Sequence, residues 1–295
     1  MPHVAARLRF IEPQPASPVD QPPKGNYWIH ELKHDGYRCQ VLLEQGSARV
    51  FTRNGHDWSP RYSSIVDAAS NLRCKTVILD GEAVQDGSGA SDFDSLRSAK
   101  RRWAPETILY AFDLLHLDGI DLRRETLFER RANLRWLIGV NAESRIQFSE
   151  EFDGDGDTVF KACIEHKLEG IVSKHSMSRY QSGRSKTWLK TKCFTESTFV
   201  VVGTDYDPHT GAPRALLARN DSAGLIYAGA AFIALGGDER AAFFAELECL
   251  QTSWTAFKSS RGVDVKWCDP KLTVEVKYLA GSKFLRHATV RGFTR

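Results

Sequence analysis

A single lysine, Lys33, stands between two acids, Glu31 and Asp35, in the run Glu-Leu-Lys-His-Asp-Gly-Tyr-Arg. The residues on either side of this run are strand-like, so Lys33 is expected at a strand end beside an Asp-Gly turn, aimed into a pocket. A lysine is a nucleophile only when its amine is unprotonated, and burial or a nearby positive charge lowers the lysine pKa enough for this. The alternative is a surface lysine that forms an ion pair with Glu31 or Asp35.

Further charged residues lie at the ends of other predicted strands. Glu82 follows the apolar run at residues 76–80, and a carboxylate at such a place belongs as often to an ion pair as to a functional site. Lys190 and Lys192 alternate along a strand and therefore share one face. Two cations on one face suit a triphosphate, whose charge they offset; the alternative is an exposed edge strand protected by lysines. An Asn-Gly turn holds Arg53 at a strand end, or is a plain surface turn.

The residue pattern predicts the elements that must position these groups. Strands are expected where β-branched and aromatic residues concentrate, at residues 27–30, 39–43, 48–52, 76–80, 107–115 and 171–174. Helices are expected at residues 59–72, 91–103, 125–138 and 157–166, the first with Ser59 as N-cap and Pro60 in its first turn. Residues 1–26 are proline-rich and lack periodicity, which predicts an extended strap over the domain or a partly disordered arm.

After Lys192 the pattern changes to short strands separated by turns, with one helix expected at about residues 238–251. About five short strands and one helix suit an OB-fold barrel, a common nucleic-acid platform. Three aromatic residues in this part, Trp254, Phe257 and Trp267, lie among basic residues. They suit contact with a base or a sugar, although core packing is the stronger expectation for each.

Composition sets broad limits on the function. The chain has 295 residues, of which 42% are hydrophobic and 26% charged, as in globular proteins of one large or two ordinary domains. Its net charge is only +3, but basic residues cluster: residues 174–192 carry six and no acid, which suits phosphate contacts or a solvated face. The six cysteines lack metal-binding spacing and suggest reduced thiols in a cytoplasmic protein. No run resembles a signal peptide or a membrane span.

The run Lys-x-Asp-Gly-x-Arg at residues 33–38 resembles motif I of the covalent nucleotidyltransferases, which include ATP-dependent DNA ligases, RNA ligases and mRNA capping enzymes. The context from Trp28 to Arg38 most resembles the ligase module of bacterial end-joining DNA ligases of the LigD type. Four more elements follow in family order, at residues 80–82, 112–113, 169–174 and 188–192. The occurrence of all five elements in this order is very improbable by chance. The resemblance covers nearly the whole chain.

This resemblance implies an α+β chain of two domains. The first is a nucleotidyltransferase (adenylation) domain of antiparallel sheets with flanking helices at residues 1–192. A hinge at residues 193–198 leads to an OB-fold domain at residues 199–295. The second domain would cover the nucleotide during adenylation and swing onto DNA for sealing, so a disulfide that locks the domains together is expected to block sealing.

The resemblance also implies roles for individual residues. Lys33 would be the catalytic nucleophile that takes AMP from ATP, with Mg²⁺ or Mn²⁺ held by Glu82 and Glu169. Phe112, a core residue by composition alone, would stack on the purine, and Arg53 would contact the 5′-phosphate of the nick. Contacts with the nucleotide or the nick are implied for Glu31, Leu32, Arg38, Arg53, Glu82, Phe112, Lys174, Arg184, Lys190 and Lys192.

The implied activity is ATP-dependent sealing of 5′-phosphate/3′-hydroxyl nicks in double-stranded DNA, in repair or end joining. A monomer in the bacterial cytoplasm, associated with the nucleoid and aided by a Ku-type end-binding partner, is expected. The alternatives are an RNA ligase or GTP-using capping enzyme, or a nucleic-acid-binding accessory protein with a decayed site. Residues 285–295 resemble the approach to motif VI, whose Arg-x-Asp-Lys pattern is present only as far as Arg295. Without the Asp-Lys pair, a less efficient self-adenylation step is expected.

Overall fold

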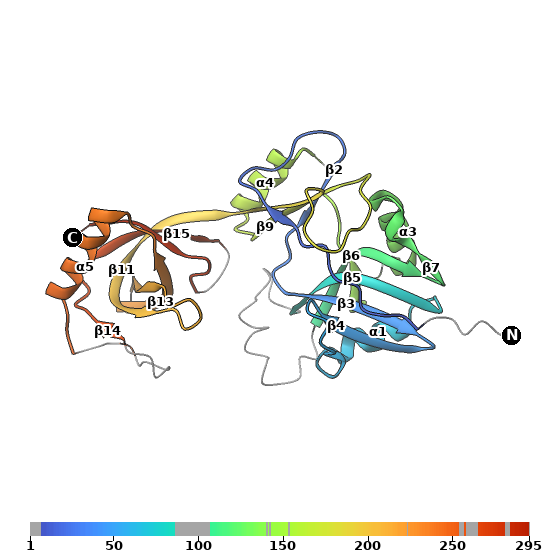
Figure 1. Ribbon diagram of the computed structural model, residues 1–295, viewed down its shortest axis with the longest axis horizontal. Helices are drawn as coiled ribbons and strands as arrows, with labels where there is room; N and C mark the ends of the chain where they lie inside the picture. The colour runs from blue at the N-terminus through green and yellow to red at the C-terminus, as the bar shows by residue number, and fades with distance from the viewer. Residues whose placement is uncertain are drawn as a thin grey trace. The chain divides into compact units, whose positions relative to one another are not determined.

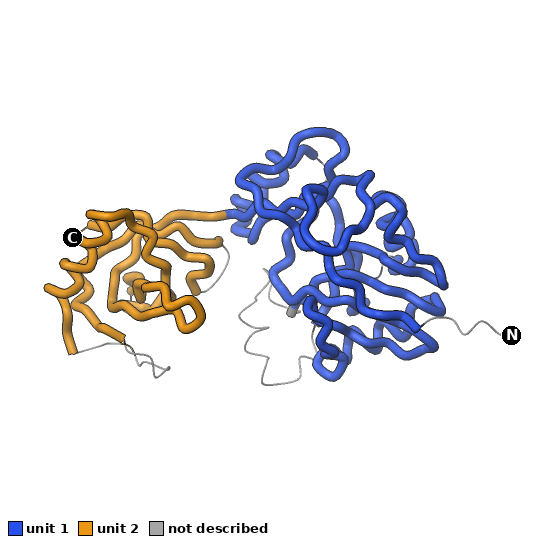
Figure 2. The backbone as a smooth tube through the Cα atoms, viewed as in Figure 1, with its two compact units in different colours: residues 1–193 blue, residues 194–295 orange. Residues whose placement is uncertain are grey.

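The computed structural model describes residues 7–85, 107–139, 141, 143–152, 154–222, 224–253, 257, 265–280 and 284–294. The chain divides into two compact units, Met1–Cys193 and Phe194–Arg295, which Figure 2 colours separately. This division coincides with the start of the predicted hinge. Residues 194–198 form the start of the first strand of unit 2, which spans Phe194–Tyr206. The hinge itself therefore stays a prediction.

Unit 1 is built on two sheets (Figure 1). The larger sheet has the order β4-β3-β5-β6-β7, with β8 beside β6. Its strands are β3 (Tyr37–Glu44), β4 (Ser47–Thr52), β5 (Thr76–Gln85), β6 (Thr107–Leu117), β7 (Ile120–Asp121) and β8 (Ile146–Phe148). The smaller sheet has the order β1-β10-β9-β2. Its strands are β1 (Ser17–Pro18), β2 (Trp28–Leu32), β9 (Gly170–His175) and β10 (Trp188–Lys192).

Alternation along the strands places apolar side chains on both faces of the larger sheet. In β3, Val41 and Leu43 join a core that includes Ile65 of helix α1 (Ser63–Ser70), whereas Leu42 between them joins a second core shared with Trp188 of β10. The second core therefore packs the two sheets against each other. The predicted antiparallel arrangement is confirmed for most pairs, although β1 pairs with β10 and β8 with β6 in parallel.

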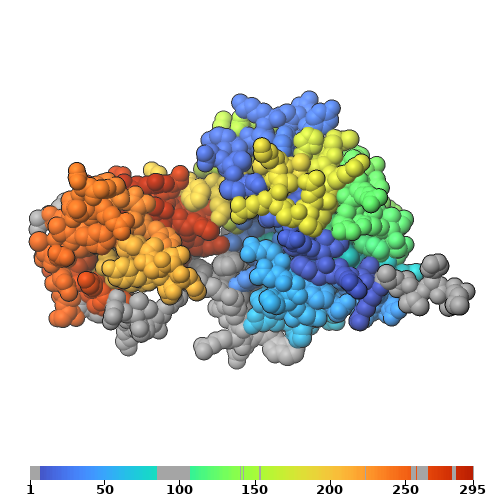
Figure 3. All heavy atoms as spheres, in the orientation of Figure 1, coloured from blue at the N-terminus to red at the C-terminus, as the bar shows by residue number. Residues whose placement is uncertain are grey.

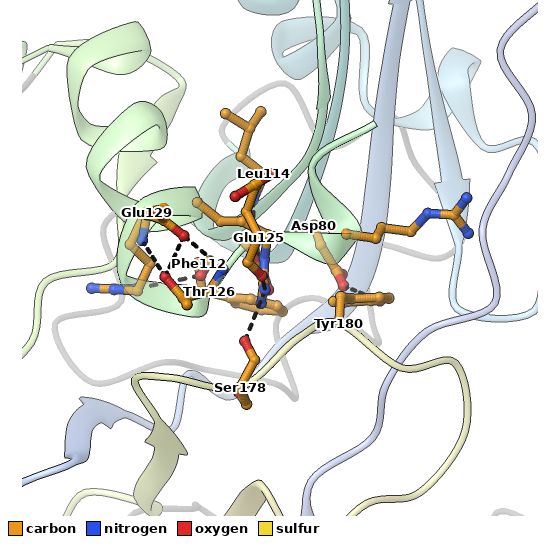
Figure 4. Close-up of polar contacts among 12 residues, drawn as sticks. Asp80, Phe112, Leu114, Glu125, Thr126, Glu129, Ser178 and Tyr180 are labelled. Atoms are coloured by element: carbon orange, nitrogen blue, oxygen red, sulfur yellow. Dashed lines mark hydrogen bonds and ion pairs between the residues drawn. The ribbon is translucent and has the colours of Figure 1, made fainter. Parts of the chain in front are cut away.

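The helical elements of unit 1 are η1 (Ser59–Arg61), α1 (Ser63–Ser70), η3 (Leu122–Arg124), α3 (Leu127–Ile138) and α4 (Gly156–Glu165). α3 begins with a capping box in which Thr126 and Glu129 satisfy each other's backbone N–H groups (Figure 4). Its inner face is not simply apolar, because Arg130 and Arg131 are buried beside its leucines.

The predicted helix at residues 59–72 is wrong in its first turn. Ser59 starts a 3₁₀ turn rather than capping a helix, because its hydroxyl donates to Asp57 and accepts from the N–H of Val50. The α-helix begins only at Ser63. The strand expected to stop at residue 80 continues to Gln85, so Glu82 lies within β5. The predicted helix at 91–103 lies outside the described residues.

Unit 2 is a barrel in which β11, β12, β13, β16 and β15 pair in turn and β15 returns to β11. This closed order of five strands confirms the predicted OB fold. Its elements are β11 (Phe194–Tyr206), β12 (Pro213–Asp221), β13 (Gly224–Ile233), α5 (Gly237–Cys249), β14 (Lys266–Trp267), β15 (Thr273–Leu279) and β16 (Thr289–Thr294). Phe257 and Trp267 pack on a small apolar cluster of the barrel, and Trp254 lies outside the described residues.

The six cysteines are free thiols, four of them buried. Over the ranges that the structure describes, no helix combines the length and the apolar character needed to cross a membrane.

Candidate active site

A pocket of about 520 Å³ lies between the two sheets of unit 1. Strands of both sheets line it, together with the turn after β4 and the segment before β1. The predicted site residues in its wall are Glu31, Leu32, Lys33, Arg38, Arg53, Glu82, Phe112, Lys174 and Lys190. Residues from five separate predicted motifs therefore meet in one cavity.

Two glycines allow the backbones around Lys33 to approach closely. The N–H of Lys33 donates to the carbonyl of Gly170, 2.9 Å away, which joins the first motif to the start of β9. A Cβ on Gly170 would lie 2.1 Å from the carbonyl oxygen of Thr191, and the φ of +143° at Gly170 is one that other residues rarely adopt. A Cβ on Gly36 would lie 2.1 Å from the carbonyl oxygen of Ala83. Neither position accommodates a side chain.

The side chain of Lys33 forms an ion pair with a residue distant in sequence. Its Nζ lies 2.7 Å from Oε1 of Glu169, whose side chain is only 5% exposed. Lys192 approaches the same oxygen at 3.8 Å. The sequence suggested Glu31 or Asp35 as ion-pair partners, but the chain folds Glu169, at the turn before β9, against the lysine.

Two carboxylates of this site have unusual surroundings. Oε2 of Glu169 is buried and has no hydrogen-bond partner among the described residues. Burial raises the pKa of Glu82 to about 7, opposed by Lys33 and Arg38 and assisted by the charge of Glu169. An orphaned carboxylate oxygen beside a carboxylate that resists ionisation indicates missing positive charge. Both residues therefore fit the predicted divalent cation.

The fit has a clear limit. Within the described ranges, no cluster of three or more histidine, cysteine or acidic residues is present. Two carboxylates alone do not make a closed metal site. Mg²⁺ is typically bound by one or two carboxylates, substrate phosphates and water, so this donor set suits a cation that arrives with a nucleotide.

Besides its acidic partner, Lys33 has several cationic side chains in its surroundings. Burial lowers the pKa of Lys190, and the positive charges of Lys33, Arg184 and Arg53 lower this pKa further. Arg53 and Arg184 themselves are exposed. Glu169 offsets only part of this positive charge, so the group favours a polyanion with oxygens on several phosphate groups.

Another part of the pocket is aromatic. Nζ of Lys174 lies 4.2 Å from the ring centre of Phe112 and 4.5 Å from that of Trp188. The same Nζ forms an ion pair with Glu31 at 2.7 Å. Burial lowers the pKa of Lys174 to about 8, although Glu31 favours its charged form. The combination of aromatic faces and a buried ammonium donor suits a planar heterocycle such as a purine base.

Comparison with known protein families matches residues 15–192 to the ATP dependent DNA ligase domain. This stretch is more than half of the chain. The chain belongs to the ATP-dependent DNA ligase family. The match contains every element that lines the ligase pocket.

Individual relatives agree with this assignment. A LigD multifunctional non-homologous end joining protein of Pseudomonas aeruginosa is 41% identical over 196 residues, which cover 66% of this chain and 23% of that protein. A LigD of Mycobacterium tuberculosis is 32% identical over 266 residues, covering 86% of this chain and 34% of that protein. The chain thus spans about a quarter to a third of the curated relatives it matches.

Solved structures extend the likeness across both units. The ligase domain of M. tuberculosis LigD has a TM-score of 0.55 at 26% identity and covers 95% of this chain and 94% of its own. A mycobacterial DNA ligase D complexed with ATP and MES has a TM-score of 0.54 at 27% identity, with the same coverage. The predicted family, fold class and type of enzyme are confirmed.

Arg38 of this ligase domain is more enclosed than the sequence suggested. Its Nε and one terminal nitrogen donate to the two oxygens of Asp80, at 3.0 and 2.7 Å. Its other terminal nitrogen donates to the carbonyl of Gln14 at 2.7 Å. Burial disfavours the charge of Arg38, but Asp80 more than offsets this and its pKa lies above the ordinary value. These bonds direct the guanidinium group into the protein, although Arg38 also lines the pocket.

The structure does not bring every predicted residue to the ligase pocket in the same way. Glu169 is connected to the pocket by its ion pair with Lys33, and Lys192 approaches the same oxygen of Glu169. The charge of Arg184 acts on the pocket residue Lys190, whose pKa it lowers. The ammonium of Lys174, for which the resemblance implied a contact with the nucleotide or the nick, is held by Glu31 beside the rings of Phe112 and Trp188. Glu31 is itself fully engaged, because it also accepts from Arg131 and from the hydroxyl of Ser149.

Several functional neighbours were not identified from the sequence. Tyr180 donates to Asp80 at 2.7 Å, and the two side chains point toward one another in Figure 4. Gln14 accepts from Arg38 through its carbonyl group. His34 stacks on Tyr110 at 4.2 Å, and burial lowers the pKa of His34 to about 4. The sequence pointed to Asp80 and His34 only in that both lie within motifs, at residues 80–82 and 31–38.

Proposed function

We propose that this ligase domain seals 5′-phosphate/3′-hydroxyl nicks in double-stranded DNA through an AMP group carried on Lys33. The observation that carries the proposal is the 2.7 Å pair between Lys33 and Glu169, set beside a pocket lined by Glu82, Lys190 and Phe112. This set provides a nucleophile, charge for the phosphates and an aromatic wall for the base.

In the first step, the unprotonated Nζ of Lys33 attacks the α-phosphorus of ATP. A nitrogen–phosphorus bond forms, the bond from the α-phosphorus to the bridging oxygen breaks, and pyrophosphate leaves with that electron pair. Oε1 of Glu169 lies at hydrogen-bond distance from Nζ and can accept the proton that the amine loses. A divalent cation, when bound at Glu82 and Glu169, supplies additional positive charge to the phosphates.

The lysines of β10 support this step by charge. Lys190 and Lys192 flank Thr191, whose side chain is buried on the opposite face of the strand. Their cations offset the charge that builds up on the leaving pyrophosphate, and such preorganised charge carries much of the catalysis in phosphoryl transfer.

The aromatic part of the pocket favours adenine. A protonated Lys174 only donates hydrogen bonds, so it suits N1 of adenine, an acceptor, and opposes N1–H of guanine, a donor. Glu31 fixes the orientation of this ammonium group. This argument favours ATP over the GTP used by capping enzymes.

In the second and third steps, AMP passes from Lys33 to the 5′-phosphate of the nick, and the 3′-hydroxyl then displaces AMP. The exposed Arg53 and Arg184 near Lys190 supply cations for the nick phosphate. We further propose that the hinge at residues 193–198 lets the OB-fold unit serve both nucleotide and DNA. Action as a cytoplasmic monomer, in end joining with a Ku-type partner, is part of the same proposal and draws on the LigD relatives.

The test is covalent labelling. Protein is incubated with α-labelled ATP or GTP and Mg²⁺ or Mn²⁺, then resolved on a denaturing gel beside Lys33→Ala. Lys161→Ala, which removes an exposed lysine of α4, is the matched control. Label from ATP that is lost only in Lys33→Ala is expected.

The other outcomes separate the alternatives. Label from GTP would reassign the chain to the capping enzymes. Absence of label with successful sealing of a pre-adenylated nick would show that only the first step is impaired. Absence of both activities would indicate a decayed site and refute the proposal.

A further inference from the structure

The N-terminal strap, residues 7–19, ties both sheets of unit 1 together. The N–H of Leu8 donates to Glu44, and Ile11 exchanges two hydrogen bonds with the side chain of Gln40, both on β3. Further along, β1 pairs with β10, and the N–H of Val19 donates to the carbonyl of Lys190. The strap therefore runs from the larger sheet to the strand that carries the lysines of the pocket.

The side chain of Gln14 is the most enclosed polar group of the strap, with no exposed surface. Its Oε1 accepts from the N–H of Gln181 at 2.8 Å. Its Nε2 donates to the hydroxyls of Ser185 at 2.7 Å and Thr187 at 3.1 Å. All three bonds thus go to the loop at residues 181–187, which has no regular secondary structure and carries Arg184.

Other strap residues bond to the same loop. The hydroxyl of Ser182 donates to the carbonyl of Glu12, and the N–H of Gly183 donates to the carbonyl of Pro13. The hydroxyl of Ser17 donates to the carbonyl of Ser185. In Figure 3 the dark-blue strap lies directly beside the yellow residues of this region. Bonds from the strap therefore hold the chain on both sides of Arg184, in addition to the bonds that Ser185 and Thr187 make with each other.

The backbone of Gln14 closes a ring of hydrogen bonds behind the pocket. Its N–H donates to the Tyr180 hydroxyl at 3.1 Å, and that hydroxyl donates to Asp80. Asp80 accepts from Arg38, which donates to the carbonyl of Gln14. One residue thus fixes Arg38 through its backbone and the Arg184 loop through its side chain.

We propose that Gln14 is a positioning residue for nick sealing, acting through Arg184. It holds the loop so that the guanidinium group of Arg184 stays beside Lys190 and meets the phosphate of the nick. The inference rests on the proposed ligase function and adds a residue outside every recognised motif. Displacing a catalytic group by about 1 Å can slow a reaction about 100-fold, so loss of these three bonds is expected to slow sealing by about 10- to 100-fold.

The test compares Gln14→Met with Gln40→Met. Both side chains are buried amides that tether the same strap and neither lines the pocket, but among the described residues the side chain of Gln40 hydrogen-bonds to Ile11 and not to the Arg184 loop. The rate of sealing a pre-adenylated nick is measured for each, together with its urea unfolding curve. Both variants are expected to lose similar stability. At a temperature where each is folded, only Gln14→Met should seal at least about 10-fold more slowly.

The second part combines Gln14→Met with Arg184→Ala. If Gln14 acts through Arg184, Gln14→Met should slow sealing less than about threefold when Arg184 is absent, while its effect on stability is unchanged. Should Gln14→Met fail to fold, Ser185→Ala with Thr187→Val removes two of the three bonds from the loop side, and the same results are expected.

Two results would overturn the inference. One is equal sealing by Gln14→Met and Gln40→Met, and the other is an undiminished effect of Gln14→Met in the Arg184→Ala background. Wild-type protein that neither labels with ATP nor seals a pre-adenylated nick would overturn the proposed function as well. If the wild-type protein seals normally, either of the two results above overturns only the role of Gln14 and leaves the proposed function standing.

Discussion

The ion pair between Asp113 and Arg130 yields a sharp prediction about stability. Oδ1 and Oδ2 of Asp113 accept from Nε and a terminal nitrogen of Arg130 at 2.7 and 2.8 Å, and neither side chain is exposed. The remaining terminal nitrogen of Arg130 donates to the carbonyls of Glu125 and Ser178. Asp113 follows Phe112 on β6, so the pair anchors α3 behind the ring that lines the pocket.

Asp113→Ala would leave the Arg130 charge buried without a counter-ion. Breaking a buried pair in this way costs about 3–5 kcal/mol. At about 2–4 °C per kcal/mol for a domain of this size, the midpoint of thermal unfolding should fall by about 6–20 °C. Replacing both residues, as Asp113→Leu with Arg130→Met, removes the stranded charge and should recover most of this loss.

The assay is thermal and urea unfolding of each single variant and of the double variant. Glu150→Ala is the control, because its partner Arg135 and Glu150 itself are largely exposed and the pair should contribute less than about 1 kcal/mol. Below the transition, labelling of Lys33 by folded Asp113→Ala should stay within about threefold of wild type. A cost below about 1 kcal/mol for Asp113→Ala, or a double variant as unstable as the sum of the singles, would refute the reasoning.

Two further predictions follow from the pocket. Gly36→Ala should destabilise the fold by several kcal/mol, on the order of an overpacked core site, because its Cβ would lie 2.1 Å from the Ala83 carbonyl oxygen. Stability is measured by urea unfolding. Gly237→Ala is the control, because the space around Gly237 is open. The folded-state pKa of Glu82 is about 7 against an ordinary 4.5, so the folded state binds its proton more tightly. The stability contributed by this proton is complete below pH 4.5 and is lost as the pH rises through about 7, on the order of 3 kcal/mol. Glu82→Gln should flatten unfolding free energy against pH in this window, and an unchanged slope would show that Glu82 ionises normally.

Much of the fold could be predicted from the sequence because its signals are local. Apolar residues concentrate in β3 and β4, and the turn between them contains Gly46. The change to short strands after Lys192 indicates the barrel. The motifs locate the pocket because each places a charged residue at the end of, or within, a strand that reaches the space between the sheets.

Pairing between motifs could not be predicted, because it depends on the register between distant strands. Lys33 meets Glu169 because β2 and β9 pair with Leu32 opposite Ile171. A shift of one residue would turn these side chains to the other face. Gln14 was missed for a related reason: an irregular strap has no periodicity, and its value lies wholly in contacts with a loop far along the chain.

The acids of the motifs divide into two groups that sequence spacing does not separate. Asp80, Asp113 and Glu31 are each bound by an arginine, namely the half-buried Arg38 and the buried Arg130 and Arg131. Glu82 resists ionisation, and Glu169 keeps one oxygen without a partner. The charges of the first group are already paired within the protein, so these acids have a structural part in and around the pocket. Lys33 and Lys192 approach only Oε1 of Glu169, so its Oε2 and the carboxyl group of Glu82 are the acidic groups of the motifs that keep capacity to bind a cation.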